Sequence, residues 1–574
     1  MNIRKTGLAV ALGALAATAG ADGLYEGFAN PPDSAKPHVW WHWMNGNVSR
    51  DGIVADLAAM KKAGVGGAQI FDASDGIPPG PVAFGSEEWK ACVRLAASES
   101  KRLGLELAIH NCSGWSSSGG PWITPDQAQK HVVFTETAVR GGTRFTGALP
   151  QPDDPFGYYR DIAAVAVKVP AAERLRMEDF GLKLSATCAR EARKIAALTD
   201  GDLLKKACGM HKPKKGGLPN VYTFAFERPF PAAGLSFAGH VPQRYGDCYV
   251  TVTAGRETLV EKRRVCMSMM GEKNRAFIYV PFEKRVAARE FKALFEFKSA
   301  EPHLEMAEIR LEAGYRTPDL SAKVFDIRYD SYPRRNVEPA SDQVVAPRDV
   351  KVLARGEAAG KPLDWTAPDG EWTLIRFGYA CDGKKNRPAS YAGEGLEVDK
   401  LDADAVEGHY REFRKLIPSS AEGLATLIID SYETGCPNWT ERFEREFAAR
   451  RGYDFVPHLV ELTGRVVGDQ AKTERALADF RRTVADLFAE NYGRRFAELC
   501  HRDGYKLEME GYGSCPSSDF EYGRWADIPM GEFWAAAGNG GKTGNVRYAG
   551  FLSHVWGKRF AASESFTAGD NTGR

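Results

Sequence analysis

Two glutamates, far apart in the chain, stand at the ends of segments that read as buried strands. Glu433 follows the apolar run 425–429, and Glu564 follows the segment 557–562. Hydrolysis of a glycosidic bond needs two opposed carboxyl groups, one that donates a proton and one that acts on water or on the sugar carbon. A barrel of parallel strands gathers its strand ends on one face, where the two side chains would meet. Spacing alone leaves a second interpretation open, in which both glutamates cap helices or pair with arginines.

Further carboxylates stand at strand ends in the same half of the predicted barrel. Asp430 is close enough to Glu433 to raise its pKa, or it could simply accept hydrogen bonds that orient the loop. The others are Glu508, Glu510 and Glu532. So many carboxylates in one place need protons, arginines or a cation to neutralise them at pH 7. Calcium prefers oxygen ligands of this kind, but the chain has no EF-hand loop, so the pattern leaves the neutralising group open.

Histidines, tryptophans and a polar loop accompany these carboxylates. His42 and His110 lie at strand ends, and His554 lies on the helix that adjoins the last strand. The loop 111–122 follows a strand directly and contains glycines, serines and two tryptophans, one of them Trp115. This composition suits carbohydrate, because sugar hydroxyls need short polar partners and sugar rings need aromatic faces. The loop lacks the Lys-Ser/Thr ending of a phosphate cradle, and each histidine could instead be a core residue with satisfied hydrogen bonds.

The elements that would position these residues alternate between strand and helix. Ser49 caps the first helix and Gly64 ends it, while Gly104 ends the second helix. The predicted elements are, in order, strand 37–43, helix 49–64, strand 65–71, helix 89–103 and strand 105–110. Short links between such elements favour right-handed parallel units, and therefore an α/β barrel or an open parallel sheet.

A different rhythm runs from about residue 132 to residue 355, where short alternating segments are separated by Gly, Pro and charged turns. This pattern is typical of an antiparallel β-sandwich. The α/β pattern is predicted to resume at 372–377 and to continue with strands 426–430, 506–510 and 559–564 and helices 439–451, 473–500 and 549–556. The predicted fold is a (β/α)8-type TIM barrel with a β-sandwich inserted after its third strand.

The predicted boundaries are a signal peptide over 1–21, barrel over 22–135, sandwich over 136–355 and barrel over 356–574. The sequence stops ten residues after Glu564 with no closing helix, so we expect the C-terminus to be truncated.

The composition excludes several classes of protein. The chain has 574 residues, of which 43% are apolar and 26% charged, as in a folded protein of two or three domains. A formal charge of +1 provides no net field to attract nucleic acid or a membrane surface. The ten cysteines include no C-x-x-C pair, so a zinc site is unsupported.

The N-terminus is typical of a secretory signal peptide. Arg4 and Lys5 precede the small, apolar stretch 6–20, and Ala19-Gly20-Ala21 fits a cleavage site. The apolar stretch is short for a membrane span, and no later stretch is long enough. We therefore predict export to the periplasm or the extracellular space, with no integral membrane span after signal removal.

Several sequence blocks resemble the glycoside hydrolase family 106 α-L-rhamnosidases. They occur in order over nearly the whole chain after the signal, which is more specific than any one motif. The blocks are Phe28-Ala29-Asn30-Pro31-Pro32, Trp40 to Asn47, Gly64-Val65-Gly66-Gly67, Gly114-Trp115 with Gly119 to Pro125, Gly395 to Lys400, Asp430-Ser431-Tyr432-Glu433, Arg451-Gly452-Tyr453-Asp454, Asp527 to Trp534, and Ser563-Glu564-Ser565-Phe566-Thr567.

The resemblance implies an inverting hydrolase that releases terminal α-L-rhamnose from plant or microbial oligosaccharides or polysaccharides. It implies Glu433 as general acid and Glu564 as general base, and a calcium ion near the sugar with Glu532 and Glu510 as candidate ligands. The residues expected to bind substrate are His42, His110, Trp115, Asp430 and His554. An inverting mechanism would place the two carboxyl groups roughly 6.5–9.5 Å apart, whereas about 5 Å would indicate retention.

Two other functions remain open at this stage. Related barrels process other deoxy sugars or uronides, and one sequence does not reveal the shape of the pocket. The chain could also be a catalytically inactive carbohydrate-binding protein.

Overall fold

A computed structural model describes most of the chain after its N-terminus. The predicted signal peptide, 1–21, lies outside the described residues. The described ranges are 23–116, 118–187, 192–202, 208–210, 212, 217–239, 247–266, 277–297, 304–325, 337–419, 421–512, 515–534 and 544–567.

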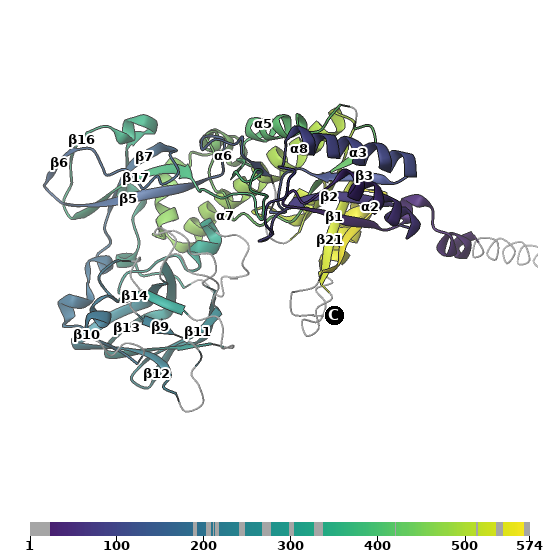
Figure 1. Ribbon diagram of the computed structural model, residues 1–574. Helices are drawn as coiled ribbons and strands as arrows, with labels where there is room; N and C mark the ends of the chain where they lie inside the picture. Colours follow the sequence, from purple (N-terminus) through teal and green to yellow (C-terminus); the bar gives the residue numbers. More distant parts are fainter. Residues whose placement is uncertain are drawn as a thin grey trace, which may run out of the picture.

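The central element is a seven-stranded parallel sheet that curls into an open half-barrel, at the right of Figure 1. Its strands lie side by side in the order of the sequence: β1 (His38–Met44), β2 (Gly67–Ala73), β3 (Glu106–His110), β19 (Leu424–Ile429), β20 (Lys506–Glu510), β21 (Ile528–Trp534) and β22 (Ala562–Thr567). Every neighbouring pair is parallel. The α/β class is therefore confirmed. Among the described strands β22 does not pair with β1, so a closed eight-stranded barrel stays a prediction.

Local sequence explains why these units form. All seven residues of β2 are buried, as expected for a parallel strand that is covered on both of its faces. Helices α2 (Arg50–Lys62) and α3 (Glu87–Leu103) begin after serines whose side chains accept backbone hydrogen bonds, and Gly104 ends α3 in the left-handed conformation at φ 66°. The predicted alternation of strand and helix in this region is confirmed.

Further helices follow the insertion along the chain. They are α5 (Ala403–Arg414), α6 (Phe443–Arg451), α7 (Gln470–Leu487), α8 (Arg495–Arg502), α9 (Asp519–Gly523) and α10 (Gly544–Val555). The predicted long helix 473–500 is confirmed as a continuous helical region in which the π-helical segment η10 (Phe488–Arg494) joins α7 to α8. No helix in the described ranges is both long and apolar enough to cross a bilayer.

Between β3 and β19 the chain forms antiparallel sheets, at the left of Figure 1. The smaller sheet has the order β15 (Val350–Arg355), β7 (Tyr159–Lys168), β17 (Glu371–Cys381) and β5 (Lys130–Arg140). The short strands β6 (Arg144–Gly147) and β16 (Leu363–Thr366) form a separate pair.

The prediction that the α/β pattern resumes at 372–377 is wrong. This segment belongs to β17, which pairs antiparallel with both β5 and β7. Ile375 and Phe377 lie in the main core, while Trp372 and Leu374 lie in a second core on the other face. A strand buried on both faces reads as a continuous apolar run, which is also the signature of a parallel strand. The antiparallel region therefore extends from Lys130 to Cys381, beyond the predicted limits 136–355.

The larger antiparallel sheet has its own hydrophobic core, below the smaller sheet in Figure 1. Its strands are β12 (Glu257–Cys266), β11 (Asp247–Ala254), β13 (Phe277–Glu296), β10 (Asn220–Gly239), β14 (Leu304–Glu312) and β9 (Cys208–Met210), with β8 (Lys183–Ala186) also pairing with β10. The prediction of an antiparallel β insertion is confirmed, while the exact sandwich architecture stays a prediction.

Candidate active site

Carboxylates from four neighbouring strands gather at the C-terminal edge of the parallel sheet. Asp430 directly follows β19, Glu510 is the last residue of β20, and Glu532 and Glu564 face each other in the register of β21 and β22. One oxygen from each of Asp430, Glu510 and Glu564 lies within 4.8 Å of the other two. We refer to these three residues as the carboxylate cluster. Parallel pairing of consecutive strands therefore produces the convergence that the sequence predicted.

Glu510 is the most deeply buried member of the carboxylate cluster, and its negative charge is poorly compensated. Its side chain is 1% exposed, and neither carboxyl oxygen has a hydrogen-bond partner among the described residues. Burial raises the pKa of Glu510 well above its usual range, and the charges of Asp430 and Glu564 raise it further. A buried, unpaired carboxylate is costly, so this group requires a proton or a cation.

Glu564, the predicted base, is the half-buried member of the carboxylate cluster. Thr567 Oγ1 donates a hydrogen bond to Glu564 Oε1 at 2.6 Å. Burial raises the pKa of Glu564 to about 7, an effect that the Thr567 hydrogen bond opposes and that the charges of Asp430, Glu532 and Glu433 strengthen. The carboxyl groups of Glu564 and Glu433 therefore interact electrostatically, although 131 positions (564 − 433) separate them in sequence.

Glu433, the predicted acid, stands in the loop after β19. Its side chain reaches solvent, and Ser431 Oγ donates a hydrogen bond to Glu433 Oε1 at 3.2 Å. Partial enclosure by the surrounding protein raises the pKa of Glu433, and the charges of Asp430 and Glu532 add to this rise. Hydrogen bonds from Ser431 and Trp115 act in the opposite direction. A carboxyl group with a raised pKa that remains accessible is suited to donate a proton to a leaving group.

The predicted metal ligands are only partly brought together. Glu510 belongs to the carboxylate cluster, whereas Glu532 lies outside it and accepts a hydrogen bond from Tyr512 Oη at 2.8 Å. Asp430, predicted as a substrate contact, is in the cluster instead. Glu508 precedes Glu510 by two residues in β20 and accepts a hydrogen bond from Gln69 Nε2 at 2.9 Å.

Carboxylate oxygens are the ligands that calcium prefers. The orphaned oxygens of Glu510 and the orphaned Oδ1 of Asp430 are what a hard cation would satisfy, so the residues present fit one.

An aromatic wall stands beside the carboxylates. His110 Nε2 lies 3.5 Å from Asp430 Oδ2, and the charge of Asp430 also acts on His42. The centroid of the Phe71 ring, in β2, lies 5.1 Å from that of His42, 4.6 Å from that of His110 and 6.0 Å from that of Trp115. The structure therefore groups three of the predicted substrate contacts around Phe71. Sequence reasoning missed Phe71, whose signal was its place at the end of a predicted strand.

His554 is not brought to this site, which corrects its prediction as a substrate contact. It is exposed in the last turn of α10, the helix that precedes β22. Helices between parallel strands run back against the strand direction, so this end of α10 lies where β22 begins. Lys558, shortly after His554, is close enough to Asp527 for their charges to interact, and Asp527 precedes β21. His554 is thus at the opposite edge of the sheet from the carboxylate cluster.

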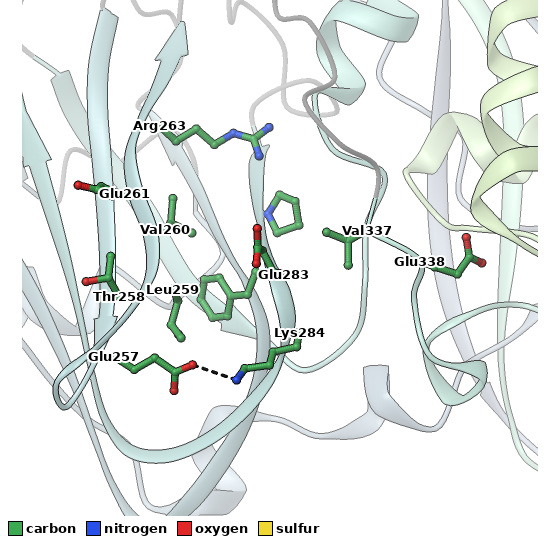
Figure 2. Close-up of a pocket in the computed structure, with 12 residues that line it drawn as sticks. Glu257, Thr258, Leu259, Val260, Glu261, Arg263, Glu283, Lys284, Val337 and Glu338 are labelled. Atoms are coloured by element: carbon green, nitrogen blue, oxygen red, sulfur yellow. Dashed lines mark ion pairs between the residues drawn. The ribbon is translucent and has the colours of Figure 1, made fainter.

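A separate hollow of about 820 Å³ lies on the larger antiparallel sheet (Figure 2). Glu257 Oε1 and Lys284 Nζ form an ion pair there at 3.1 Å, and both side chains are well exposed. Glu261 and Glu338 stand on opposite sides of the hollow in Figure 2. Among the described residues, the group of carboxylates able to hold a metal lies at the parallel sheet and not here.

Comparisons with known proteins agree with this geometry. A family model described as alpha-L-rhamnosidase matches residues 29–572. A solved rhamnosidase from Novosphingobium sp. PP1Y superposes with a TM-score of 0.77 and 29% identity, covering 95% of this chain and 53% of that chain. A curated protein of Formosa agariphila, which carries the provisional name beta-glucuronidase, is 31% identical over 549 residues, covering 95% of this chain and 35% of the relative. The chain thus spans about half and about a third of the lengths of these two relatives.

Proposed function

The chain belongs to the α-L-rhamnosidases of glycoside hydrolase family 106, and we propose that it releases terminal α-L-rhamnose from plant or microbial glycans. The resemblance drawn from the sequence blocks is thereby confirmed as family membership. The observation that carries the proposed activity is the electrostatic interaction between Glu433 and Glu564 at the strand ends, beside an aromatic wall. Two carboxyl groups with raised pKa values in one site match the requirements of glycoside hydrolysis.

Glu433 is proposed as the general acid and Glu564 as the general base. The raised pKa of Glu433 would keep its proton available for the glycosidic oxygen, and its exposure would let it reach a bound sugar. Glu564 would remove a proton from a water molecule on the opposite face of the sugar ring, which gives inversion. Such a mechanism predicts a separation of roughly 6.5–9.5 Å between the two carboxyl groups in the substrate complex.

Calcium is proposed as the cofactor, held by Asp430 and Glu510 with Glu564 alongside. A bound cation would supply positive charge that compensates the carboxylates and attracts the oxygens of the sugar hydroxyls. The chain's own contribution is to hold Asp430 against His110 and to keep Glu510 buried where an uncompensated charge is unstable.

A second candidate is a glycosidase for a uronide, favoured by the name of the Formosa agariphila relative. When no cation is bound, the carboxylate cluster argues against it, because a uronic acid would bring another negative charge toward several carboxylates. A neutral deoxy sugar brings none. A catalytically inactive carbohydrate-binding protein is the third candidate, and the presence of both carboxyl groups disfavours it.

The test is hydrolysis of a panel of 4-nitrophenyl glycosides that includes α-L-rhamnopyranoside and β-D-glucuronide, with and without a chelator. We expect turnover of the rhamnoside, loss of that turnover on chelation, and β-L-rhamnose as the first product anomer in NMR spectra. Preferred turnover of the glucuronide would replace the proposed sugar. Sugar binding without any turnover would leave only a binding function.

Export to the periplasm or extracellular space is proposed from the sequence of residues 1–21. N-terminal sequencing of the protein recovered from cell fractions tests it. The proposal fails if the recovered chain is found in the cytoplasm and retains these residues.

A further inference from the structure

Gln129 binds the residues on both sides of Glu433. Tyr432 Oη donates a hydrogen bond to Gln129 Oε1 at 3.0 Å, and Gln129 Nε2 donates one to the Thr434 carbonyl oxygen at 3.1 Å. Gln129 is 0% exposed and Tyr432 is 1% exposed. The backbone of Glu433 is therefore anchored one residue before and one residue after it, while its side chain remains exposed to solvent.

Gln129 is itself held in one orientation by its backbone and its amide. Its N–H donates to the Glu397 carbonyl oxygen at 3.0 Å, and its own carbonyl oxygen accepts from the Asp382 N–H at 3.0 Å. Lys400 Nζ donates to Gln129 Oε1 at 3.3 Å. Gln129 Nε2 also donates to Asp382 Oδ2 at 3.2 Å. A charged donor on the amide oxygen and a carboxylate acceptor at the amide nitrogen fix the oxygen toward Tyr432 Oη and the nitrogen toward the Thr434 carbonyl oxygen.

Lys400 forms a fully buried ion pair behind this amide. Lys400 Nζ lies 2.6 Å from Glu397 Oε2, and both side chains are 0% exposed. The ammonium group lies 5.5 Å from the ring centroids of both Tyr432 and Tyr492. Buried ion pairs contribute little net stability compared with well-packed apolar residues, and what this one does observably is hold the Lys400 ammonium beside the Gln129 amide.

We propose that Gln129 is a positioning residue for Glu433, oriented by the buried pair of Lys400 and Glu397. The inference rests on the proposed function, in which Glu433 is the general acid. A proton donor acts only from a narrow range of positions, and a displacement of about 1 Å can cost about a hundredfold in rate. Loss of the Gln129 amide would release both anchors of the loop without touching the carboxyl group.

The experiment compares Gln129→Met with a matched control, Gln343→Met. Gln343 is also a buried glutamine that holds a turn, donating to the Ala313 carbonyl oxygen at 3.0 Å and accepting from the Ala340 N–H at 2.9 Å. Each variant is assayed on an alkyl α-L-rhamnoside, whose leaving group needs protonation, and on the 2,4-dinitrophenyl rhamnoside, whose leaving group does not. The ratio of the two kcat/KM values reports proton donation and is insensitive to a uniform loss of folded protein.

For Gln129→Met we expect kcat/KM on the alkyl substrate to fall about 10- to 100-fold and on the dinitrophenyl substrate less than about threefold. Gln343→Met should leave the ratio unchanged. Equal losses on both substrates, or no loss on the alkyl substrate, would overturn the inference. If Gln129→Met does not fold, Tyr432→Phe removes one of the two anchors with little change in volume, and the same ratio decides.

Failure of the inference and failure of the proposed function give different results. A wild-type protein without rhamnoside turnover refutes the proposed function. An active wild type in which Glu433→Gln shifts the ratio, but neither Gln129→Met nor Tyr432→Phe does, refutes the inference alone.

Discussion

The carboxylate cluster should make the free energy of unfolding depend on pH when no cation is bound. When a chelator removes divalent metal, the three carboxyl groups of Asp430, Glu510 and Glu564 can be neutralised only by protons. The pKa of Glu564 lies at about 7 in the folded chain against 4.5 for an unperturbed glutamate, so the folded state binds its proton more tightly than the unfolded state. The free energy of unfolding of the metal-free protein should therefore fall as pH rises from about 4.5 to about 7.

The magnitude follows from the shift. A difference of about 2.5 pKa units corresponds to about 3 kcal/mol, which we reduce to about 2 kcal/mol because Glu564 keeps partial contact with solvent. Glu510 acts in the same direction, since its pKa is raised as well. Calcium at a hundred times its Kd would stabilise the folded state by about 2.7 kcal/mol, and this gain should grow as the pH rises and the carboxylates ionise.

Thermal unfolding at pH 5 and pH 8, in chelator and in calcium, measures both effects. Glu564→Gln should flatten the pH dependence of the chelated protein. Glu308→Gln is the matched control, because Glu308 in β14 also has a pKa raised by burial but stands outside the carboxylate cluster, so this variant should keep the calcium response. Chelated protein that is more stable at pH 8 than at pH 5, or calcium that stabilises equally at both pH values, would refute the reasoning.

Three further predictions follow from single residues. Glu433→Gln should lower the hydrolysis rate about 10²- to 10⁴-fold on alkyl rhamnosides and much less on activated aryl rhamnosides. Glu564→Gln should lower the rate on both substrates. Equal losses on both substrates in Glu433→Gln would contradict the role of Glu433 as acid. Arg465→Met should lower the free energy of unfolding by about 1–3 kcal/mol, because Arg465 is 5% exposed and binds Glu136 at 2.6 Å while the Glu136 side chain is 37% exposed, and denaturant titration measures this loss. His554→Ala should leave kcat/KM within about twofold of wild type, since an exposed side chain away from the site contributes little, and a larger loss would return His554 to the site.

Much of the parallel half-barrel could be predicted from local patterns. Serine caps, terminating glycines and short apolar runs define its early strands and helices, and the run before Glu433 identifies β19 as a strand. Because consecutive parallel strands share one C-terminal edge, the convergence of Asp430, Glu510 and Glu564 follows from the same patterns.

Other features depended on tertiary contacts that no local pattern contains. The burial of β17 on both faces arises from two different cores, so its sequence could not distinguish an antiparallel strand from a parallel one. The role of Gln129 depends on contacts with residues more than 250 positions away. The wrong prediction for His554 could have been avoided from the sequence. A helix between parallel strands runs against the strand direction, so its last turn lies at the edge opposite the C-terminal ends of the strands.

The long antiparallel insertion between β3 and β19 delays the pairing of these two strands during synthesis of the chain. Asn111 and Ile428, whose backbones pair at the centre of the sheet, are 317 positions apart. At about 5–20 residues per second, a ribosome needs roughly 15–60 s to synthesise the intervening chain. During that interval β3 can pair only with β2, and the edge that later binds β19 has no partner strand. We therefore expect the open edge of β3 to need shielding until β19 has been made, more than in a barrel of the same size without an insertion.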